Sequence, residues 1–423
     1  MNIAFLGIVL VAFATAARRQ IQWIGEGTSP MEGLSGAVID SAAGAVELAL
    51  GLVGVMTLFL GLMKVAEAGG LLRILAALIR PLMVRLFPEV PAGHPAMGAM
   101  IMNLSANAMG LGNAATPFGI RAMQELNKLN PRQGTATDSM ALFLAINTSS
   151  ITLLPTGVIA LRASAGSADP AGILPTTLFA TLCSTAMAVI AAKVYSRFSR
   201  FRVEGADGDR AEESREDASG DVSQAYPLWV SLSALGILVG MIPLAVIYGK
   251  TLSPWIIPSL LAGFLLFGLL RGVKVYEVFV EGAKEGFQVA LRIIPYLVAI
   301  LVAVGMFRAS GALEYLVNWI GPWTGRVGLP AEALPMALMR PLSGSGAYGI
   351  LASIIQDPAV GPDSYTGYLV STLQGSTETT FYVLAVYFGA VQVRRIRHTL
   401  ATALTADLFA VIAAVVACTY LLR

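Results

Sequence analysis

The fold is decided by the stretch PAMGAMIMNLSANAMGLGNAATPFGIRAMQEL, residues 95–126. Most of it is apolar enough to lie at membrane depth. Two glycines, an asparagine and a proline interrupt its helical pattern, at Gly110, Gly112, Asn113 and Pro117. Lipid cannot hydrogen-bond the backbone groups that an interruption frees, so irregular backbone at this depth must be buried in protein or line a water-filled cavity. The stretch therefore predicts a broken membrane helix beside a pocket.

Three further apolar segments are interrupted in the same way. They are ALFLAINTSSITLLPTGVIAL (141–161), PMALMRPLSGSGAYGILASII (335–355) and YLVSTLQGSTETTFYVLAVYFG (368–389). Together the four interrupted segments carry most of the polarity that we expect inside the membrane. They are the candidate binding segments.

The composition assigns the whole chain to the membrane. Of its 423 residues, 56% are hydrophobic and 13% are charged, and the mean hydropathy is +0.71. A helical span needs about 20 apolar residues. The clearest candidate spans are 43–63, 174–192, 228–247, 256–270, 291–306 and 400–422. We expect an all-α polytopic integral membrane protein of two homologous halves with interrupted helices, re-entrant or broken.

Several function classes are excluded. A net charge of +2, with no basic block containing aromatic residues, argues against nucleic-acid binding. The two histidines and two cysteines are too few and too scattered for a metal site or a Ser-His-Asp triad. The hydroxyls beside Glu378 in GSTETT have no neighbouring His or Lys base. We therefore predict no catalytic residue, no metal and no resident cofactor.

An internal repeat is the most informative pattern in the chain. The segment that begins at Gly44 aligns with the one that begins at Gly282, a displacement of about 240 residues. Matched pairs are Glu47 and Glu285, Gly70 and Gly311, Leu72 and Leu313, Pro81 and Pro322, and Pro95 and Pro335. Farther along, Asn147 to Ser150 aligns with Gln374 to Thr377. Each copy contains an apolar helix, an amphipathic helix and two broken segments, and the sequence leaves open whether the copies are parallel or inverted.

Long motifs in both halves resemble a known family. HPAMGAMIMNLSANAMGLGNAATPFGIRAM and AINTSSITLLPTGVIALR are similar to spore maturation protein A. VYEVFVEGAKEGF, FRASGALEYL, LPMALMRPLSGSGA and STLQGSTETTFYVLAVYFGAV resemble spore maturation protein B. Both belong to the nucleoside recognition, or Gate domain, group. The resemblance implies an integral membrane protein and supplies no substrate.

The resemblance also suggests the domain organisation. Residues 1–200 form a spore maturation protein A-like half with a Gate repeat at about 40–163. Residues 226–423 form a B-like half with a Gate repeat at about 279–391. Between them, residues 201–225 are strongly acidic and predict a disordered linker. We expect a multi-pass protein of the bacterial plasma (inner) membrane.

The candidate substrate-binding residues are polar side chains of the four broken segments. They are Asn103, Ser105, Asn107, Asn113 and Thr116; Asn147, Thr148, Ser149 and Ser150; Arg340, Ser343 and Ser345; and Gln374, Ser376, Thr377 and Glu378. Amides and hydroxyls both donate and accept hydrogen bonds, which suits a small polar solute. The structural alternative is that they only hold helices together.

Arg340 and Glu378 are the most telling of these residues, because ionisable groups are costly inside a membrane. Glu378 is a candidate to carry a proton or bind Na⁺ as a coupling ion, and Arg340 to hold a carboxylate or phosphate. A purely structural Arg-Glu pair is the alternative.

The sequence thus indicates a transporter-like protein, for secondary transport or export of a small polar solute, anionic or nucleoside-like, through a site between the two repeats. Membrane lipid and the solute are the expected partners, and a homo-oligomer is allowed. The alternative is a non-transporting membrane scaffold in envelope or spore maturation.

Overall fold

The structure is a computed structural model that describes residues 2–25, 27–110, 112–149, 152–198 and 227–421. Within these ranges the regular secondary structure is helical, and the one β contact is an isolated bridge between Thr135 and Arg395. Three helices are long and apolar enough to cross a membrane: Pro30–Ala68, Leu174–Phe198 and Thr399–Tyr420. The predicted all-α polytopic fold class is confirmed. The predicted linker, 201–225, lies outside the described residues.

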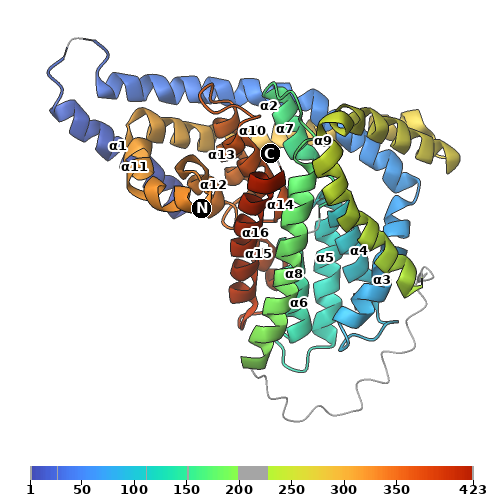
Figure 1. Cartoon of the computed structure of the whole chain (residues 1–423). Coiled ribbons are helices and arrows are strands. Elements are labelled where there is room, and N and C mark those ends of the chain that lie inside the picture. The colour runs from blue at the N-terminus through green and yellow to red at the C-terminus, as the bar shows by residue number, and fades with distance from the viewer. Residues whose placement is uncertain (1, 26, 111, 150–151, 199–226, 422–423) are drawn as a thin grey trace.

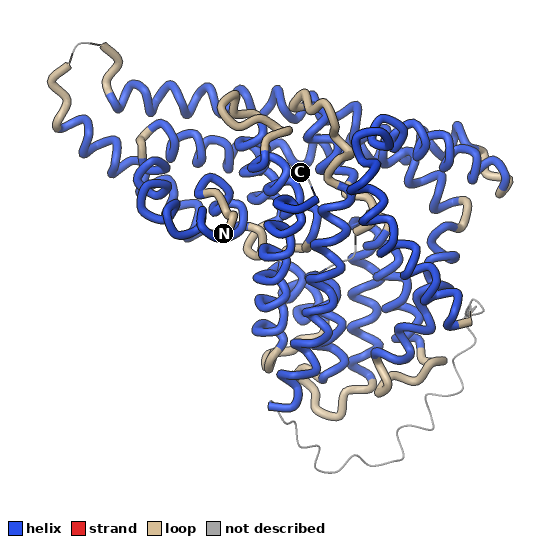
Figure 2. Tube along the Cα trace, in the orientation of Figure 1, coloured by secondary structure: helices blue, strands red, loops and turns tan. Residues whose placement is uncertain are grey.

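Both halves contain the same succession of helices (Figures 1 and 2). The first half consists of α1 (Asn2–Ile21), α2 (Pro30–Ala68), α3 (Leu71–Leu86), α4 (Pro95–Ala108), α5 (Gly112–Lys128), α6 (Asp138–Ser149), α7 (Thr156–Ser164) and α8 (Leu174–Phe198). The second consists of α9 (Leu228–Leu270), α10 (Val275–Ala309), α11 (Ala312–Thr324), η3 (Gly325–Val327), η4 (Ala331–Ala333), α12 (Leu334–Met339), α13 (Gly344–Ile355), α14 (Tyr365–Ser376), α15 (Thr380–Ala390) and α16 (Thr399–Leu421).

All four predicted helix breaks are confirmed. They lie between α4 and α5, between α6 and α7, between α12 and α13, and between α14 and α15. The prediction of two separate spans at 228–247 and 256–270 is wrong, because α9 is a single helix over Leu228–Leu270. Pro254 lies between the two expected spans, and an internal proline can kink a helix without ending it.

The starts of α3 and α11 show that the halves are copies of one unit. Each helix follows a glycine in the left-handed conformation, Gly70 with φ +88° and Gly311 with φ +80°. Only glycine adopts this conformation without steric cost. Each helix also contains a proline eleven positions after that glycine, Pro81 in α3 and Pro322 in α11. The aligned glycines therefore precede equivalent helices in the two halves, and the aligned prolines lie at equivalent positions inside those helices.

The two copies are inverted. Asp138, at the start of α6, accepts a hydrogen bond of 2.7 Å from Arg397, which lies just before α16. Tyr365, at the start of the equivalent helix α14, lies 3.2 Å from Thr419 near the other end of α16. The equivalent helices thus enter the bundle from opposite ends of one spanning helix. This settles the orientation that the sequence left open.

The long helices α2 and α10 pack antiparallel through glycines. A Cβ at Gly61 would meet the ring of Phe279 at 2.7 Å, whereas one at Gly305 would collide with the hydroxyl of Ser41. Between them, a Cβ at Gly286 would lie 2.7 Å from the Cα of Thr57. Small residues at such positions let helix backbones approach closely in a membrane.

We expect Gly286→Ala to destabilise this helix pair by about 1–3 kcal/mol, because the added methyl meets backbone that cannot move aside. Gly54→Ala on α2 is the matched control, since a Cβ there has no neighbour within 4 Å. It should stabilise the helix by about 0.5–1 kcal/mol. Thermal unfolding of the purified protein measures both changes. Equal effects of the two substitutions would contradict the close packing.

Candidate functional site

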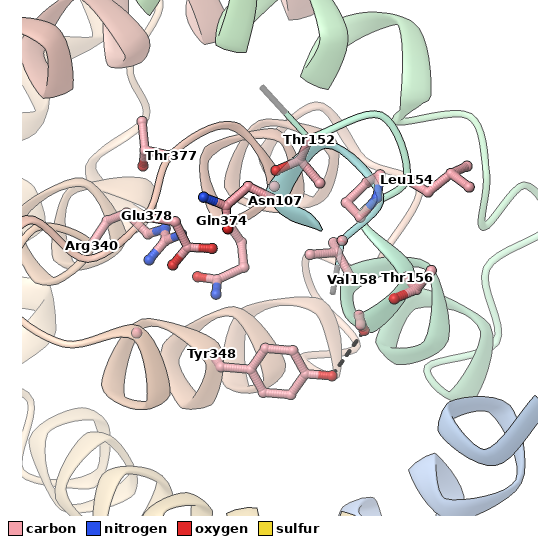
Figure 3. A pocket seen from close by; sticks show the side chains of 15 residues that line it. Asn107, Thr152, Leu154, Thr156, Val158, Arg340, Tyr348, Gln374, Thr377 and Glu378 are labelled. Atoms are coloured by element: carbon pink, nitrogen blue, oxygen red, sulfur yellow. Dashed lines mark hydrogen bonds between the residues drawn. The ribbon is translucent and has the colours of Figure 1, made fainter. Parts of the chain in front are cut away.

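The four helix breaks meet around one cavity of about 210 Å³ (Figure 3). Asn107 and Gly110 line it from the α4–α5 break, and the 152–158 segment lines it from the α6–α7 break. Arg340 comes from the α12–α13 break, and the 374–378 segment from the α14–α15 break. Both repeats therefore contribute both of their interrupted segments to the same space.

Backbone hydrogen bonds join the breaks to one another. In the first half, the N–H of Leu153 donates to the carbonyl of Ala108 over 2.9 Å. In the second half, the N–H of Phe381 donates to the carbonyl of Pro341 over 3.0 Å, a closely similar contact. Across the halves, the N–H of Glu378 donates to the carbonyl of Thr148 over 2.7 Å. These bonds satisfy groups that the interrupted helices leave free.

Charged and amide side chains give the cavity its chemical character. Figure 3 shows the Arg340 guanidinium beside the Glu378 carboxylate, with Gln374 next to them. Arg340 is 6% exposed and donates to the hydroxyl of Thr379 over 3.0 Å. The amide oxygen of Gln374 is buried and has no hydrogen-bond partner among the residues that the structure describes. The cavity thus presents a cation, an anion and an unused acceptor to whatever enters it.

Five of the predicted site residues line the cavity directly: Asn107, Arg340, Gln374, Thr377 and Glu378. Asn147 lies behind them, where its amide oxygen accepts from Asn107 over 2.9 Å and its amide nitrogen donates to Phe143. Asn147 therefore positions a lining residue.

The other predicted residues are outside the cavity lining or are not described. Five hydroxyls bond to nearby backbone: those of Ser105, Thr148, Ser149, Ser343 and Ser376. Ser345 lies 3.5 Å from Ser343, and Asn103 donates to Ala115 and to Tyr387. Thr116 lies on α5. Ser150 and the side chain of Asn113 lie outside the described residues.

Two buried ionisable residues escaped the sequence analysis. Asp407, 7% exposed, lies in the apolar helix α16 and accepts a hydrogen bond of 2.6 Å from Thr380, which follows the α14–α15 break. Arg162 is fully buried in α7. An isolated charge within an apolar stretch was the available signal in both cases.

Arg162 joins the two halves beside the cavity-lining break of α6 and α7. Its guanidinium lies 4.2 Å from the centre of the Tyr368 ring. It donates to the carbonyls of Pro362 and Asp169 and to the side chains of Ser167 and Asp363. The planar guanidinium can satisfy several acceptors at once, which an ammonium cannot do in this geometry.

We expect Arg162→Lys to lower the free energy of unfolding by about 1–3 kcal/mol, because lysine keeps the charge but loses most of these bonds. Arg326→Lys is the matched control, since Arg326 is exposed and lies over the Trp323 ring at 5.9 Å. Thermal unfolding of both variants is the measurement. An Arg162→Lys variant as stable as the control would refute the role of Arg162 in joining the halves.

His94 caps the helix that begins the first broken segment. Its Nδ1 accepts a hydrogen bond of 3.1 Å from the N–H of Ala96. Burial lowers the pKa of His94 below its ordinary value. Since the unfolded chain binds this proton more readily, the stability that neutral His94 contributes is complete above about pH 6.5 and is lost as the pH falls.

We therefore expect the melting temperature to fall below about pH 6.5, and His94→Asn to reduce that fall. Asparagine retains a cap acceptor but does not titrate. The difference between variant and wild type isolates His94 from His398, whose pKa is also lowered by burial. An identical pH profile in the two proteins would count against the assignment.

The fold and cavity define a helical membrane protein of two inverted repeats with discontinuous helices around a polar site. The nucleoside recognition (Gate) family model matches residues 49–165 and 290–394. The chain belongs to this family.

Two relatives and one solved structure extend the comparison. The chain is 48% identical to spore maturation protein B of Bacillus subtilis (strain 168) over 170 residues, 40% of this chain and 94% of that protein. It is 47% identical to spore maturation protein A of the same organism over 160 residues, 38% of this chain and 82% of that protein. The predicted resemblance to both proteins is confirmed. A structure of CNTnw in an inward-facing substrate-bound state is 15% identical, covers 97% of this chain and 91% of that chain, and has a TM-score of 0.46.

Proposed function

We propose that this chain is a non-enzymatic secondary transporter or exporter of a small polar solute, anionic or nucleoside-like. It acts as a multi-pass protein of the bacterial plasma (inner) membrane. Membrane lipid and the solute are its partners, and a homo-oligomer is compatible with this role. Na⁺ or H⁺ supplies the coupling.

One observation carries the proposal: the breaks of two inverted repeats converge on a single polar cavity of about 210 Å³. Sites built from discontinuous helices between inverted repeats are typical of secondary transporters, in which one repeat rocks against the other. A scaffold has no need of a buried guanidinium, a half-buried carboxylate and an unpartnered amide oxygen in one cavity. The geometry therefore favours solute binding.

The lining residues suggest the chemistry of the solute. A guanidinium such as that of Arg340 recognises a carboxylate or a phosphate through paired N–H donors. The oxygens of Glu378 and Gln374 accept from hydroxyl or amino groups of the same solute. A cavity of about 210 Å³ restricts the choice to small molecules.

We expect one class in a panel of nucleosides, amino acids, dicarboxylates and dipicolinate to raise the melting temperature of the purified protein. A ligand that binds only the folded state stabilises it, by about 2.7 kcal/mol at a hundred times its Kd. Glu378→Gln and Gln374→Ala should weaken the response at least tenfold in apparent Kd, because both side chains line the cavity.

Ser376→Ala is the control variant, since the Ser376 hydroxyl bonds to the carbonyl of Leu373 and is not among the cavity-lining groups. It should respond as the wild type does. The same ligand should then move across proteoliposome membranes that contain the wild type but not Glu378→Gln. Silence across the panel would argue for the scaffold alternative, and a response that both cavity variants keep would place the binding site outside this cavity.

A further inference from the structure

Asp407 is a buried acid that the proposed solute site does not use directly. It lies in the middle of α16 and is 7% exposed, and its carboxylate is absent from the groups that line the cavity. Its Oδ2 accepts from the hydroxyl of Thr380 over 2.6 Å, while its Oδ1 is buried with no hydrogen-bond partner in the described part of the chain. A fully ionised carboxylate with one unsatisfied oxygen is costly at this depth.

The positive charge near Asp407 is shared with a second acid. Arg340 interacts electrostatically with both Asp407 and Glu378. Arg340 donates to the Thr379 hydroxyl, and the adjacent Thr380 donates to Asp407, so consecutive residues connect the cation to the buried acid. One guanidinium between two ionised carboxylates leaves the group with a net charge of −1. A single proton makes it neutral.

Over the residues that the structure describes, the helices around α16 carry few charged side chains. α16 packs against α6, α8, α14 and α15. Their ionisable side chains are Asp138 on α6; Cys183, Lys193, Tyr195 and Arg197 on α8; Tyr365 and Tyr368 on α14; and Tyr382 and Tyr387 on α15. Asp138 pairs with Arg397 just before α16, and Lys193 and Arg197 are exposed near the end of α8. Among these described groups, Arg340 is the cation that acts on Asp407.

We propose that Asp407 binds and releases a proton, and that this proton balances the charge of Arg340 and Glu378 at the cavity. Asp407 takes the proton rather than Glu378 because Glu378 reaches the cavity and can be hydrated there, whereas Asp407 is buried behind it.

The contact with Thr380 accommodates both states of the acid. When Asp407 is ionised, the hydroxyl of Thr380 donates to Oδ2. When Asp407 is protonated, its Oδ2–H donates to the oxygen of Thr380 instead, because a hydroxyl both donates and accepts. The unpartnered Oδ1 is then a neutral carbonyl oxygen, which is less costly to bury than a carboxylate oxygen. No rearrangement of the helix is required.

Proton binding here has a consequence for transport, and this part rests on the proposed function. An anionic group that binds Arg340 competes with the carboxylates for its charge, which favours protonation of Asp407. The solute and the proton would therefore bind together. The coupling ion is then H⁺, and Asp407 rather than Glu378 is its site.

Infrared spectroscopy of the purified full-length protein tests the proton site without any solute. Exposed carboxyl groups are mostly ionised above about pH 5.5, so a carbonyl stretch that grows as the pH falls from about 8 to 5.5 reports a buried acid. We expect this band in the wild type and its loss in Asp407→Asn. It should persist in Glu378→Gln and in Asp40→Asn, the control at an exposed aspartate of α2. Thr380→Val should move it to higher frequency, because the acid loses its hydrogen-bond partner.

Other outcomes would overturn the proposal. A wild type without the band, or a band that survives in Asp407→Asn, removes the proton from Asp407. If the band is lost in Glu378→Gln but kept in Asp407→Asn, the proton is on Glu378 in the cavity. Loss on adding Na⁺ at constant pH shows that the site binds Na⁺ instead. Because no solute is present, these results are independent of the ligand panel, so failure of the transporter proposal and failure of the proton site are distinguishable.

Discussion

The architecture depends on one constraint: backbone groups freed by a helix break cannot be left facing lipid. Four such breaks lie within the described residues, and hydrogen bonds between the breaks satisfy some of their free backbone groups. Leu153 bonds to Ala108 within the first half, Phe381 bonds to Pro341 within the second, and Glu378 bonds to Thr148 across the halves. Since each break supplies partners for another, the breaks must lie at the same place. The cavity forms where they meet.

Because the repeats are inverted, equivalent helices of the two halves reach the breaks from opposite directions. α6 and α14 enter from opposite ends of α16, so each stops near the middle of the bundle, where the other stops too. Parallel copies would place equivalent breaks side by side at the same depth, with equivalent chain directions. In the inverted arrangement, Thr148 near the end of α6 instead meets Glu378, just beyond the end of α14. The chain then continues into α7 in the first half and into α15 in the second.

The sequence predicted the breaks because their causes are local: Gly110, Gly112 and the glycines of 343–346 interrupt apolar helices wherever they are placed. The inversion has no local cause, since aligned residues look the same in either orientation. The sequence alone also does not identify which polar residues line the cavity. Ser105 and Asn107 are two positions apart, about 200° around a helix, so only one can face the cavity. Asn107 lines it, whereas the Ser105 hydroxyl bonds back to Ile101.

Asp407 lies in an uninterrupted apolar helix, α16, and not at a helix break. Its helix satisfies its own backbone, so no pocket is implied by the pattern around it. The cost of burying a charge is nevertheless the same in a continuous helix as in a broken one. In this fold that cost is met by Arg340, which lies at the α12–α13 break of the same half and also lines the cavity. A charge placed between a buried acid and an accessible one links them: whatever alters Glu378 or occupies Arg340 alters the state of Asp407 as well. Helix breaks therefore create the cavity, and an unbroken helix supplies the group that responds to its occupation.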